Sequence, residues 1–158
     1  MKTLYCIVLF VLTQTLSAQD PDNSIHSDNH KNEIGIANSP VFVLKEKEFA
    51  YGLHTHYVRN LNGTNFGIGV GYERIFDEHK HNSVGVIFSY SPLEHLYISL
   101  SPGIAFKDNG ASKLKPGIHF ETSYEFEIGF FHAGPVAEFA ASSGDYHLSL
   151  GLHIGFGF

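Results

Sequence analysis

The chain has 158 residues, of which 43% are hydrophobic and 16% charged, and 10 Lys and Arg against 16 Asp and Glu give a formal net charge of −6. This length suits one domain, and the hydrophobic fraction excludes a wholly disordered chain. The acidic balance excludes the basic footprint of a nucleic-acid-binding protein. A helix that spans lipid needs about 18 to 20 consecutive apolar residues, and the absence of such a run excludes a helical membrane protein.

The first eighteen residues have the pattern of a secretory signal peptide. A positive residue, Lys2, precedes an apolar core over residues 4–12, and a polar exit of small residues follows. The core is too short for a membrane anchor. We therefore expect residues 1–18 to be removed on export together with the only cysteine, Cys6, which leaves a chain that uses no disulfide.

Residues 19–32 form a polar stretch without hydrophobic periodicity. This composition predicts a flexible N-terminal tail. His26 and His30 would share a metal only if the stretch were helical, so a solvated tail is the preferred interpretation.

From Glu33 to Phe158 the hydrophobic period is two, which predicts β-strands. The predicted strands cover about residues 33–44, 49–57, 66–73, 84–91, 96–106, 117–128, 131–139 and 146–158. In the first of them, Pro40 interrupts the alternation and predicts a bulge. Short connections between consecutive strands indicate an antiparallel up-and-down meander.

The last strand shows most clearly how the two faces differ. One face carries only large apolar residues: Tyr146, Leu148, Leu150, Leu152, Ile154, Phe156 and Phe158. The other face of this strand, as of the others, is mostly Gly, Ser, Ala, His and Glu, and Lys and Arg are almost confined to loops and strand ends. A soluble barrel would place Lys, Glu and Thr opposite its apolar face.

Small and polar residues on one face suit the interior of a narrow closed barrel, whereas the bulky face suits lipid. Closure also satisfies every backbone polar group where no water is present. The sequence therefore predicts an all-β fold over residues 33–158, an eight-stranded antiparallel up-and-down transmembrane β-barrel. A secreted soluble β-barrel is the alternative.

In this pattern the chain resembles the small eight-stranded outer-membrane barrels of the OmpA and OmpX type. The resemblance covers about Glu33 to Phe158, and its most specific element is the ending LHIGFGF. In this ending Phe156 and Phe158 look like the terminal aromatic signal that the barrel-assembly machinery binds.

The resemblance implies a monomer in contact with outer-membrane lipid, with both termini in the periplasm. The connections near residues 44–48, 76–83, 107–115 and 142–145 would then be external. They are shorter than the loops with which some family members bind receptors, which argues against an adhesin role.

The alternation also assigns an inward-facing set that contains no Lys or Arg. This set is His54, His56, Glu73, His119, Glu121, Glu125, Glu127, His132, Glu138, His147 and His153. A two-residue turn at Ile128-Gly129 predicts two cross-strand pairs in the lumen. In this register Glu125 faces His132, and His119 faces Glu138.

A two-residue turn at Asn62-Gly63 would likewise place His54 and His56 opposite Gly71 and Gly69, which leave room for imidazole rings. We interpret the inward set first as His–carboxylate pairs that pack a narrow interior. A metal site and a narrow proton or ion path are the alternatives. Imidazole suits Zn, Cu or Ni, and the candidate ligands are His119, Glu138, His147, His54 and His56.

Catalysis is a third possibility. His147 and Ser149 resemble the His-x-Ser element of outer-membrane lipid A deacylases, but the Asn that follows in that family is absent. The alternation turns both residues toward the lumen, and the predicted register places Glu138 opposite Ser149, whereas a triad has its base between nucleophile and acid. We therefore expect a non-enzymatic envelope protein without a cofactor, with a structural role or a small-molecule or ion interaction.

Overall fold

The computed structural model describes residues 30–78, 80–108 and 114–158, in which every regular element is a strand. The strands are β1 (Asn32–Val43), β2 (Glu48–Asn60), β3 (Phe66–Phe76), β4 (His81–Leu93), β5 (Leu96–Lys107), β6 (Lys115–Tyr124), β7 (Phe126–Ile128), β8 (Phe131–Ser142) and β9 (Asp145–Gly157). The described ranges contain no helix long and apolar enough to cross a membrane. The predicted signal peptide and nearly all of the predicted tail lie outside these ranges.

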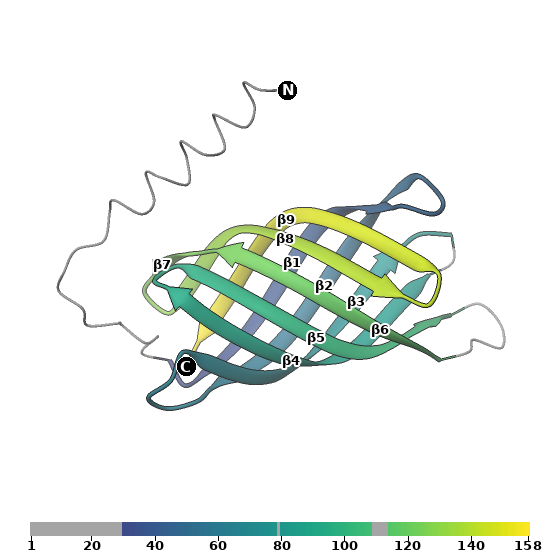
Figure 1. Ribbon diagram of the computed structural model, residues 1–158. Helices are drawn as coiled ribbons and strands as arrows, with labels where there is room; N and C mark the ends of the chain where they lie inside the picture. The colour runs from purple at the N-terminus through teal and green to yellow at the C-terminus, as the bar shows by residue number, and fades with distance from the viewer. Residues whose placement is uncertain (1–29, 79, 109–113) are drawn as a thin grey trace, which may run out of the picture.

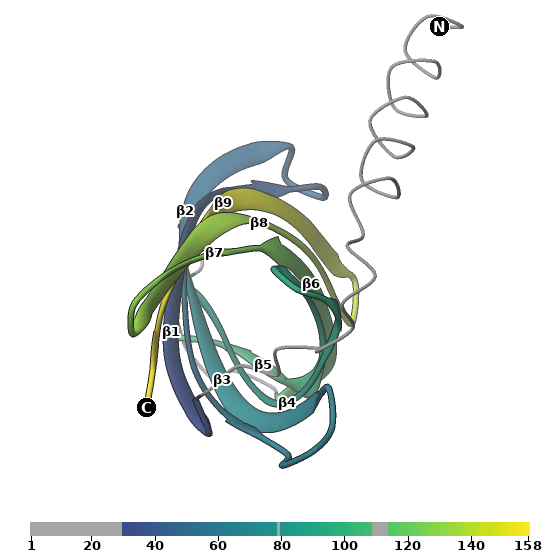
Figure 2. The same ribbon diagram turned by 90° about the vertical axis from the view of Figure 1, so that its left-hand side faces the viewer.

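The strands close into one antiparallel barrel (Figures 1 and 2). Neighbours in sequence pair with each other, β9 pairs with β1, and β6 and β7 both pair with β8. β6 and β7 are one strand interrupted at Glu125, whose backbone N–H donates to the carbonyl of His95 (2.8 Å). The barrel therefore has eight strands, and the predicted fold class is confirmed.

The two ends of the barrel are distinct (Figure 1). The terminal end carries the start of β1, the C-terminus and the turns β2–β3, β4–β5 and β7–β8. The opposite end, here the loop end, carries the connections β1–β2, β3–β4, β5–β6 and β8–β9. Because each strand crosses the whole barrel, residues early and late in one strand lie at different depths.

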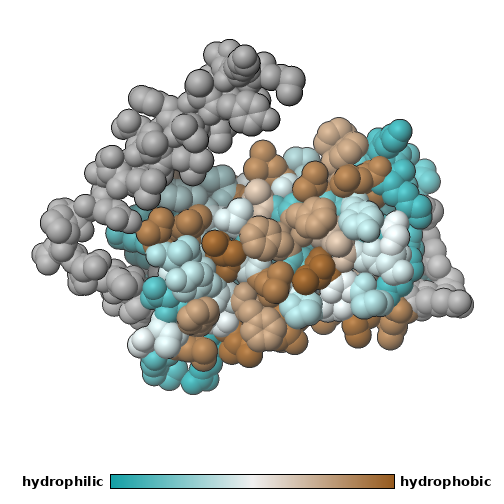
Figure 3. All heavy atoms as spheres, in the orientation of Figure 1, coloured by the Kyte–Doolittle hydropathy of each residue, from teal (hydrophilic) through white to brown (hydrophobic). Residues whose placement is uncertain are grey.

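The bulky apolar side chains point outward along the whole wall. Val70 in β3 is 56% exposed and Leu150 in the middle of β9 is 67% exposed. Figure 3 shows apolar side chains across the wall and hydrophilic ones toward the two ends of the barrel. Among the described residues the buried polar side chains outnumber the buried hydrophobic ones. This inverts the usual arrangement of a soluble protein and matches a barrel with an apolar outer band.

The register predicted between β2 and β3 is wrong by two residues. The structure pairs His54 with Glu73 and His56 with Gly71. The backbone N–H of Leu61 bonds the carbonyl of Phe66 (2.9 Å), so four residues form the turn instead of two. A longer turn moves every downstream partner by the same amount.

The register predicted between β6 and β8 is also wrong by two residues. Gly129 and Phe130 form the two-residue turn between β7 and β8, so His119 lies opposite Ala140 and Glu121 lies opposite Glu138. Gly129 has a φ of 67°, as the first central position of a type II′ turn requires. The sequence analysis placed Gly129 at the second position of the turn. Moving the turn by one residue shifts the pairing of the two strands by two residues.

The predicted bulge at Pro40 is wrong. β1 keeps one register with β2 over its whole length, with Pro40 opposite Tyr51, and keeps one register with β9 on both sides of Pro40. The proline has no N–H to donate, but its ring faces outward and the flanking pairs remain in place. The register shift in the barrel lies between Tyr90 and Leu93, where β4 meets β5.

Candidate functional site

Histidines and glutamates alternate with outward apolar residues along the strands and therefore meet in the lumen. Ten of the eleven residues predicted to face inward are buried or half-buried there: His54, His56, Glu73, His119, Glu121, Glu125, His132, Glu138, His147 and His153. Glu127 is the exception, because β7 ends at the terminal end and leaves this side chain exposed. Glu33 belongs to the set although sequence reasoning missed it. The alternation of β1 places Glu33 on the same face as Gly35 and Ala37, so the sequence pattern is sufficient to predict that Glu33 faces inward.

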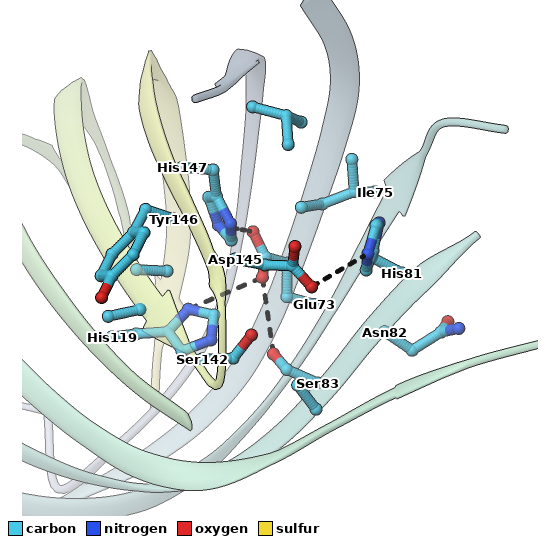
Figure 4. A pocket seen from close by; sticks show the side chains of 14 residues that line it. Glu73, Ile75, His81, Asn82, Ser83, His119, Ser142, Asp145, Tyr146 and His147 are labelled. Atoms are coloured by element: carbon cyan, nitrogen blue, oxygen red, sulfur yellow. Dashed lines mark hydrogen bonds and ion pairs between the residues drawn. The ribbon is translucent and has the colours of Figure 1, made fainter. Parts of the chain in front are cut away.

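Four of these residues form what we call the loop-side cluster: Glu73 on β3, His119 on β6, Glu138 on β8 and His147 on β9. His119 Nδ1 lies 2.8 Å from Glu138 Oε1 and 3.6 Å from Glu73 Oε2. His147 Nε2 lies 3.2 Å from Glu73 Oε1 and 3.5 Å from Glu138 Oε1. Each histidine therefore contacts both carboxylates. The Ser83 hydroxyl donates to Glu73 (3.4 Å), and Figure 4 shows Glu73 with this serine and the two histidines.

His54 and Glu121 lie beside this cluster and bridge the lumen. His54 Nδ1 is 3.2 Å from Glu121 Oε2 and 3.9 Å from Glu138 Oε2. β2, which carries His54, and β6, which carries Glu121, are separated by three strands on one side of the eight-strand ring and by three on the other. This pair therefore joins opposite walls of the barrel.

Nearer the terminal end a second group forms the terminal-side cluster: Glu33, His56, Glu125, His132 and His153. Three imidazole Nε2 atoms converge on Glu33 Oε1, from His56 at 3.1 Å, His132 at 3.3 Å and His153 at 3.9 Å. Glu125 reaches His153 Nδ1 at 2.8 Å and His132 Nε2 at 3.3 Å. The Ser123 hydroxyl also bonds Glu125.

Two glycines make room for this terminal-side cluster. A Cβ on Gly155 would overlap the ring of His132, and a Cβ on Gly35 would overlap His56 and His153. The imidazole rings thus lie directly against the backbone of β9 and β1. The close approach accounts for glycine on inward positions of a strand, where it otherwise weakens the structure.

Histidine is the main side-chain partner of the lumenal carboxylates. In the described part of the chain, no Lys or Arg occupies an inward position between the two mouths of the barrel. Lys45 and Lys115 lie at the loop end, where they pair with Asp145 at 3.4 and 3.6 Å. A buried carboxylate without a partner costs several kcal/mol, so the histidines are needed to keep these glutamates inside.

A pocket at the loop end leads to the loop-side cluster (Figure 4). Glu73, His119 and His147 line it together with His81 and Asp145, and it holds about 430 Å³ of empty space, part of which is open to solvent. The loop-side histidines retain 13% and 14% side-chain exposure, against 11% for His132, 7% for His56 and 2% for His153 in the terminal-side cluster. The two clusters therefore differ in access from outside.

The structure brings some of the candidate ligands together and separates others. His119, Glu138 and His147 share one cluster, and His54 touches it through Glu138. His56 lies in the terminal-side cluster instead. Contacts between His119 and Glu138, and between His132 and Glu125, join diagonal neighbours rather than residues directly opposite. Long side chains reach diagonal neighbours across a strand pair.

The His147 and Ser149 pair lies on the inward face of β9, and Glu138 is directly opposite Ser149. His147 Nε2 is directed at Glu73 and Glu138. The imidazole nitrogen that a hydrolase would use as base therefore contacts carboxylates.

The C-terminal aromatic residues lie on the outer surface at the terminal end. The Phe156 ring is 5.2 Å from that of Phe131 and 6.0 Å from that of Phe158, measured between centroids. The backbones of Asn32 and Phe158 exchange two hydrogen bonds (2.9 and 2.8 Å) where β1 and β9 close the barrel. The ending LHIGFGF thus belongs to the seam of the barrel.

Comparisons with known proteins find the fold but no family. No family model and no curated protein sequence matches the chain. Among solved structures, the attachment invasion locus protein Ail of Yersinia pestis matches with a TM-score of 0.58 at 14% identity, over 82% of this chain and 99% of that one. Neisserial surface protein A matches with a TM-score of 0.57 at 12% identity, over 80% and 96%.

The N-terminal β-barrel domain of Pseudomonas aeruginosa OprF matches with a TM-score of 0.50 at 16% identity, over 82% and 99%. All three are small eight-stranded outer-membrane barrels. The chain therefore has the fold of this class, as its resemblance to such barrels predicts.

Proposed function

We propose that this chain is a monomeric, non-enzymatic outer-membrane protein whose lumen is sealed by histidine–glutamate pairs. The observation that carries this proposal is the inverted polarity of the barrel. Large apolar side chains such as Leu150 and Val70 are exposed, whereas Glu73 and Glu125 are 5% and 3% exposed. Only a surrounding solvent of lipid makes such a surface favourable.

Contacts across the lumen support a barrel that does not conduct. His54 on β2 meets Glu121 on β6, and His147 on β9 meets Glu73 on β3, both at 3.2 Å. An eight-stranded barrel is only wide enough for side chains to fill it. The proposed role is thus structural within the envelope, and a narrow channel is the competing function.

The proposed orientation has the terminal end in the periplasm. The first strand begins at Asn32 and the last strand ends at Gly157, and both of these residues lie at the terminal end. The aromatic ending with Phe156 and Phe158 lies at the same end. A signal peptide over residues 1–18 would deliver the chain across the inner membrane. The barrel-assembly machinery would then bind the aromatic ending during insertion.

The geometry favours a non-enzymatic role over a lipid A hydrolase. A hydrolase of this kind needs a histidine that activates a serine next to lipid. Here His147 points into the lumen and contacts two glutamates, and the side chain next to it on the lipid side is Leu148. Release of fatty acid from lipid A by the purified barrel, abolished by Ser149→Ala, would overturn the proposal.

The membrane part of the proposal is tested by one substitution placed at two depths. Leu150→Arg puts a charge in the middle of the outer wall, and we expect it to cost about 2–4 kcal/mol of unfolding free energy in lipid vesicles. Leu44→Arg, in the β1–β2 connection at the loop end, is the matched control and should cost less than about 1 kcal/mol.

A secreted soluble barrel would tolerate both substitutions equally and would be recovered from the periplasm or medium without detergent. That result would overturn the proposal. Planar-bilayer recordings test whether the lumen is sealed, and we expect no conductance above that of the bare bilayer. Steady ohmic steps in the current would show that the barrel is a channel and would contradict the proposed structural role.

A further inference from the structure

We propose that the loop-side cluster is a binding site for one divalent transition-metal ion of the zinc type, which enters through the pocket at the loop end. Its ligands would be Glu73, His119, Glu138 and His147. This inference goes beyond the proposed structural role and does not depend on whether the barrel conducts.

The spacing of the donor atoms fits a four-coordinate ion. One donor atom from each of the four residues lies within 4.8 Å of the others. Oε1 of Glu138 lies 2.8 Å from His119 Nδ1 and 3.5 Å from His147 Nε2, whereas Glu73 presents Oε2 to His119 at 3.6 Å and Oε1 to His147 at 3.2 Å. A tetrahedral zinc site with bonds near 2.0–2.1 Å has ligand–ligand distances of about 3.3 Å. The nitrogen–oxygen distances bracket this value, and the donor pairs that lie farther apart, within 4.8 Å, would move closer together around the ion.

The donor types suit the same ion. Imidazole nitrogen combined with carboxylate oxygen is a donor set for Zn²⁺, and also for Ni²⁺ or Cu²⁺. Two carboxylates and two neutral imidazoles around a divalent ion are electrically balanced. Because no Lys or Arg occupies an inward position between the mouths in the described ranges, the ion would supply positive charge to the carboxylates of the loop-side cluster.

Outer partners hold the carboxylates in position. Glu138 presents Oε1 to both histidines, while its Oε2 faces His54 at 3.9 Å. The Ser83 hydroxyl donates to Oε2 of Glu73. Such contacts orient ligands and raise metal affinity. The four ligands also project from four different strands of a closed barrel, which limits their relative movement.

Access distinguishes this cluster from the terminal-side cluster. The pocket that opens at the loop end is lined by Glu73, His119 and His147 (Figure 4). In the terminal-side cluster, His153 is 1% exposed and packs between Glu33 and Glu125. An ion from outside therefore reaches the loop-side cluster without rearrangement of the barrel.

The test uses the full barrel, refolded in detergent, and zinc chloride as the probe. After removal of free ion by gel filtration, the zinc bound per chain is measured. Co²⁺ replaces Zn²⁺ in a parallel sample, because four-coordinate Co²⁺ gives strong visible absorption. The site variant is His147→Gln, and the matched control is His56→Gln, which changes the same residue type in the terminal-side cluster. Folding of every sample is checked by its mobility on unheated gels.

We expect one zinc ion per wild-type chain, a four-coordinate Co²⁺ spectrum, and at least a tenfold loss of affinity in His147→Gln but not in His56→Gln. If His147→Gln does not fold, Glu73→Gln, which preserves side-chain shape, replaces it with the same expectation. Wild-type protein that retains no zinc would overturn the proposal. Equal retention by the site variant and the control would overturn it too, as would loss in His56→Gln alone.

Discussion

The two clusters in the lumen contain the same residue types in different surroundings. In the loop-side cluster, two histidines alternate with two carboxylates beside a pocket, and their side chains keep some exposure. In the terminal-side cluster, three imidazoles surround one oxygen of Glu33, and His153 is almost fully buried. The first arrangement is open to an ion from solution, whereas the second is closed by backbone and rings.

The comparison shows that the residue types in a His–Glu cluster do not by themselves determine its role. Close packing against glycines turns the terminal-side cluster into part of the core, where any vacancy is costly. An adjacent pocket lets water or an ion replace a lost partner in the loop-side cluster. The predictions below separate these two roles.

The largest effect is expected when the most buried histidine is removed. His153→Ala leaves Glu125 without its 2.8 Å partner and opens a void, and we expect it to cost about 3–5 kcal/mol of unfolding free energy. His147→Ala should cost about 1–2 kcal/mol, because water from the pocket can solvate the remaining carboxylates. The chain has no tryptophan, so urea unfolding in detergent is followed by gel mobility and circular dichroism. Equal costs for the two variants would contradict the distinction between the clusters.

Zinc should stabilise the barrel through the loop-side cluster alone. At a free zinc concentration of one hundred times Kd, we expect about 2.7 kcal/mol of added unfolding free energy in the wild type and in His56→Gln. His147→Gln should gain much less at the same concentration. The measurement is the shift of the urea midpoint with and without zinc, and a chelator should reverse it. A shift that is unchanged in His147→Gln would locate the ion elsewhere.

Filling the space of a glycine should cost more at Gly155, beside the terminal-side cluster, than at Gly117 near the loop end of β6. Gly155→Ala places a methyl group against the His132 ring, and we expect a cost of about 1–3 kcal/mol from overpacking. Gly117→Ala is the matched control on β6, where the nearest atom would be an ordinary 3.4 Å away, and it should change stability by less than about 0.5 kcal/mol. Comparable costs would indicate that both halves are packed alike.

The smallest change in stability is expected at Ser149, the residue that a lipid A hydrolase would use as its nucleophile. Ser149→Ala should change the unfolding free energy by less than about 0.5 kcal/mol, since none of the hydrogen bonds described for the lumenal clusters involves its hydroxyl. Zinc retention should also be unchanged, although Ser149 lies opposite the ligand Glu138. Loss of zinc in Ser149→Ala would indicate that the Ser149 hydroxyl takes part in the metal site, and the proposed set of ligands would then be wrong.

Much of the architecture follows from sequence alone because a strand has a side-chain period of two. The alternation from Glu33 to Phe158 is sufficient to predict strand number, the outward apolar face and ten of the inward His and Glu residues. The same rule would have found Glu33. It failed at Glu127 because the alternation defines a face and not the depth at which a strand ends.

Only the tertiary structure decided which histidine meets which glutamate. One turn longer than predicted and one turn displaced by one residue shifted two registers by two residues, which preserves the face of every side chain but changes its neighbours. Contacts such as His54 with Glu121 join opposite walls, and no local pattern encodes a distance across a closed barrel. The division of the lumen into an accessible cluster and a buried one is therefore a property of barrel closure, because closure sets the depth of each residue and the partners that it faces.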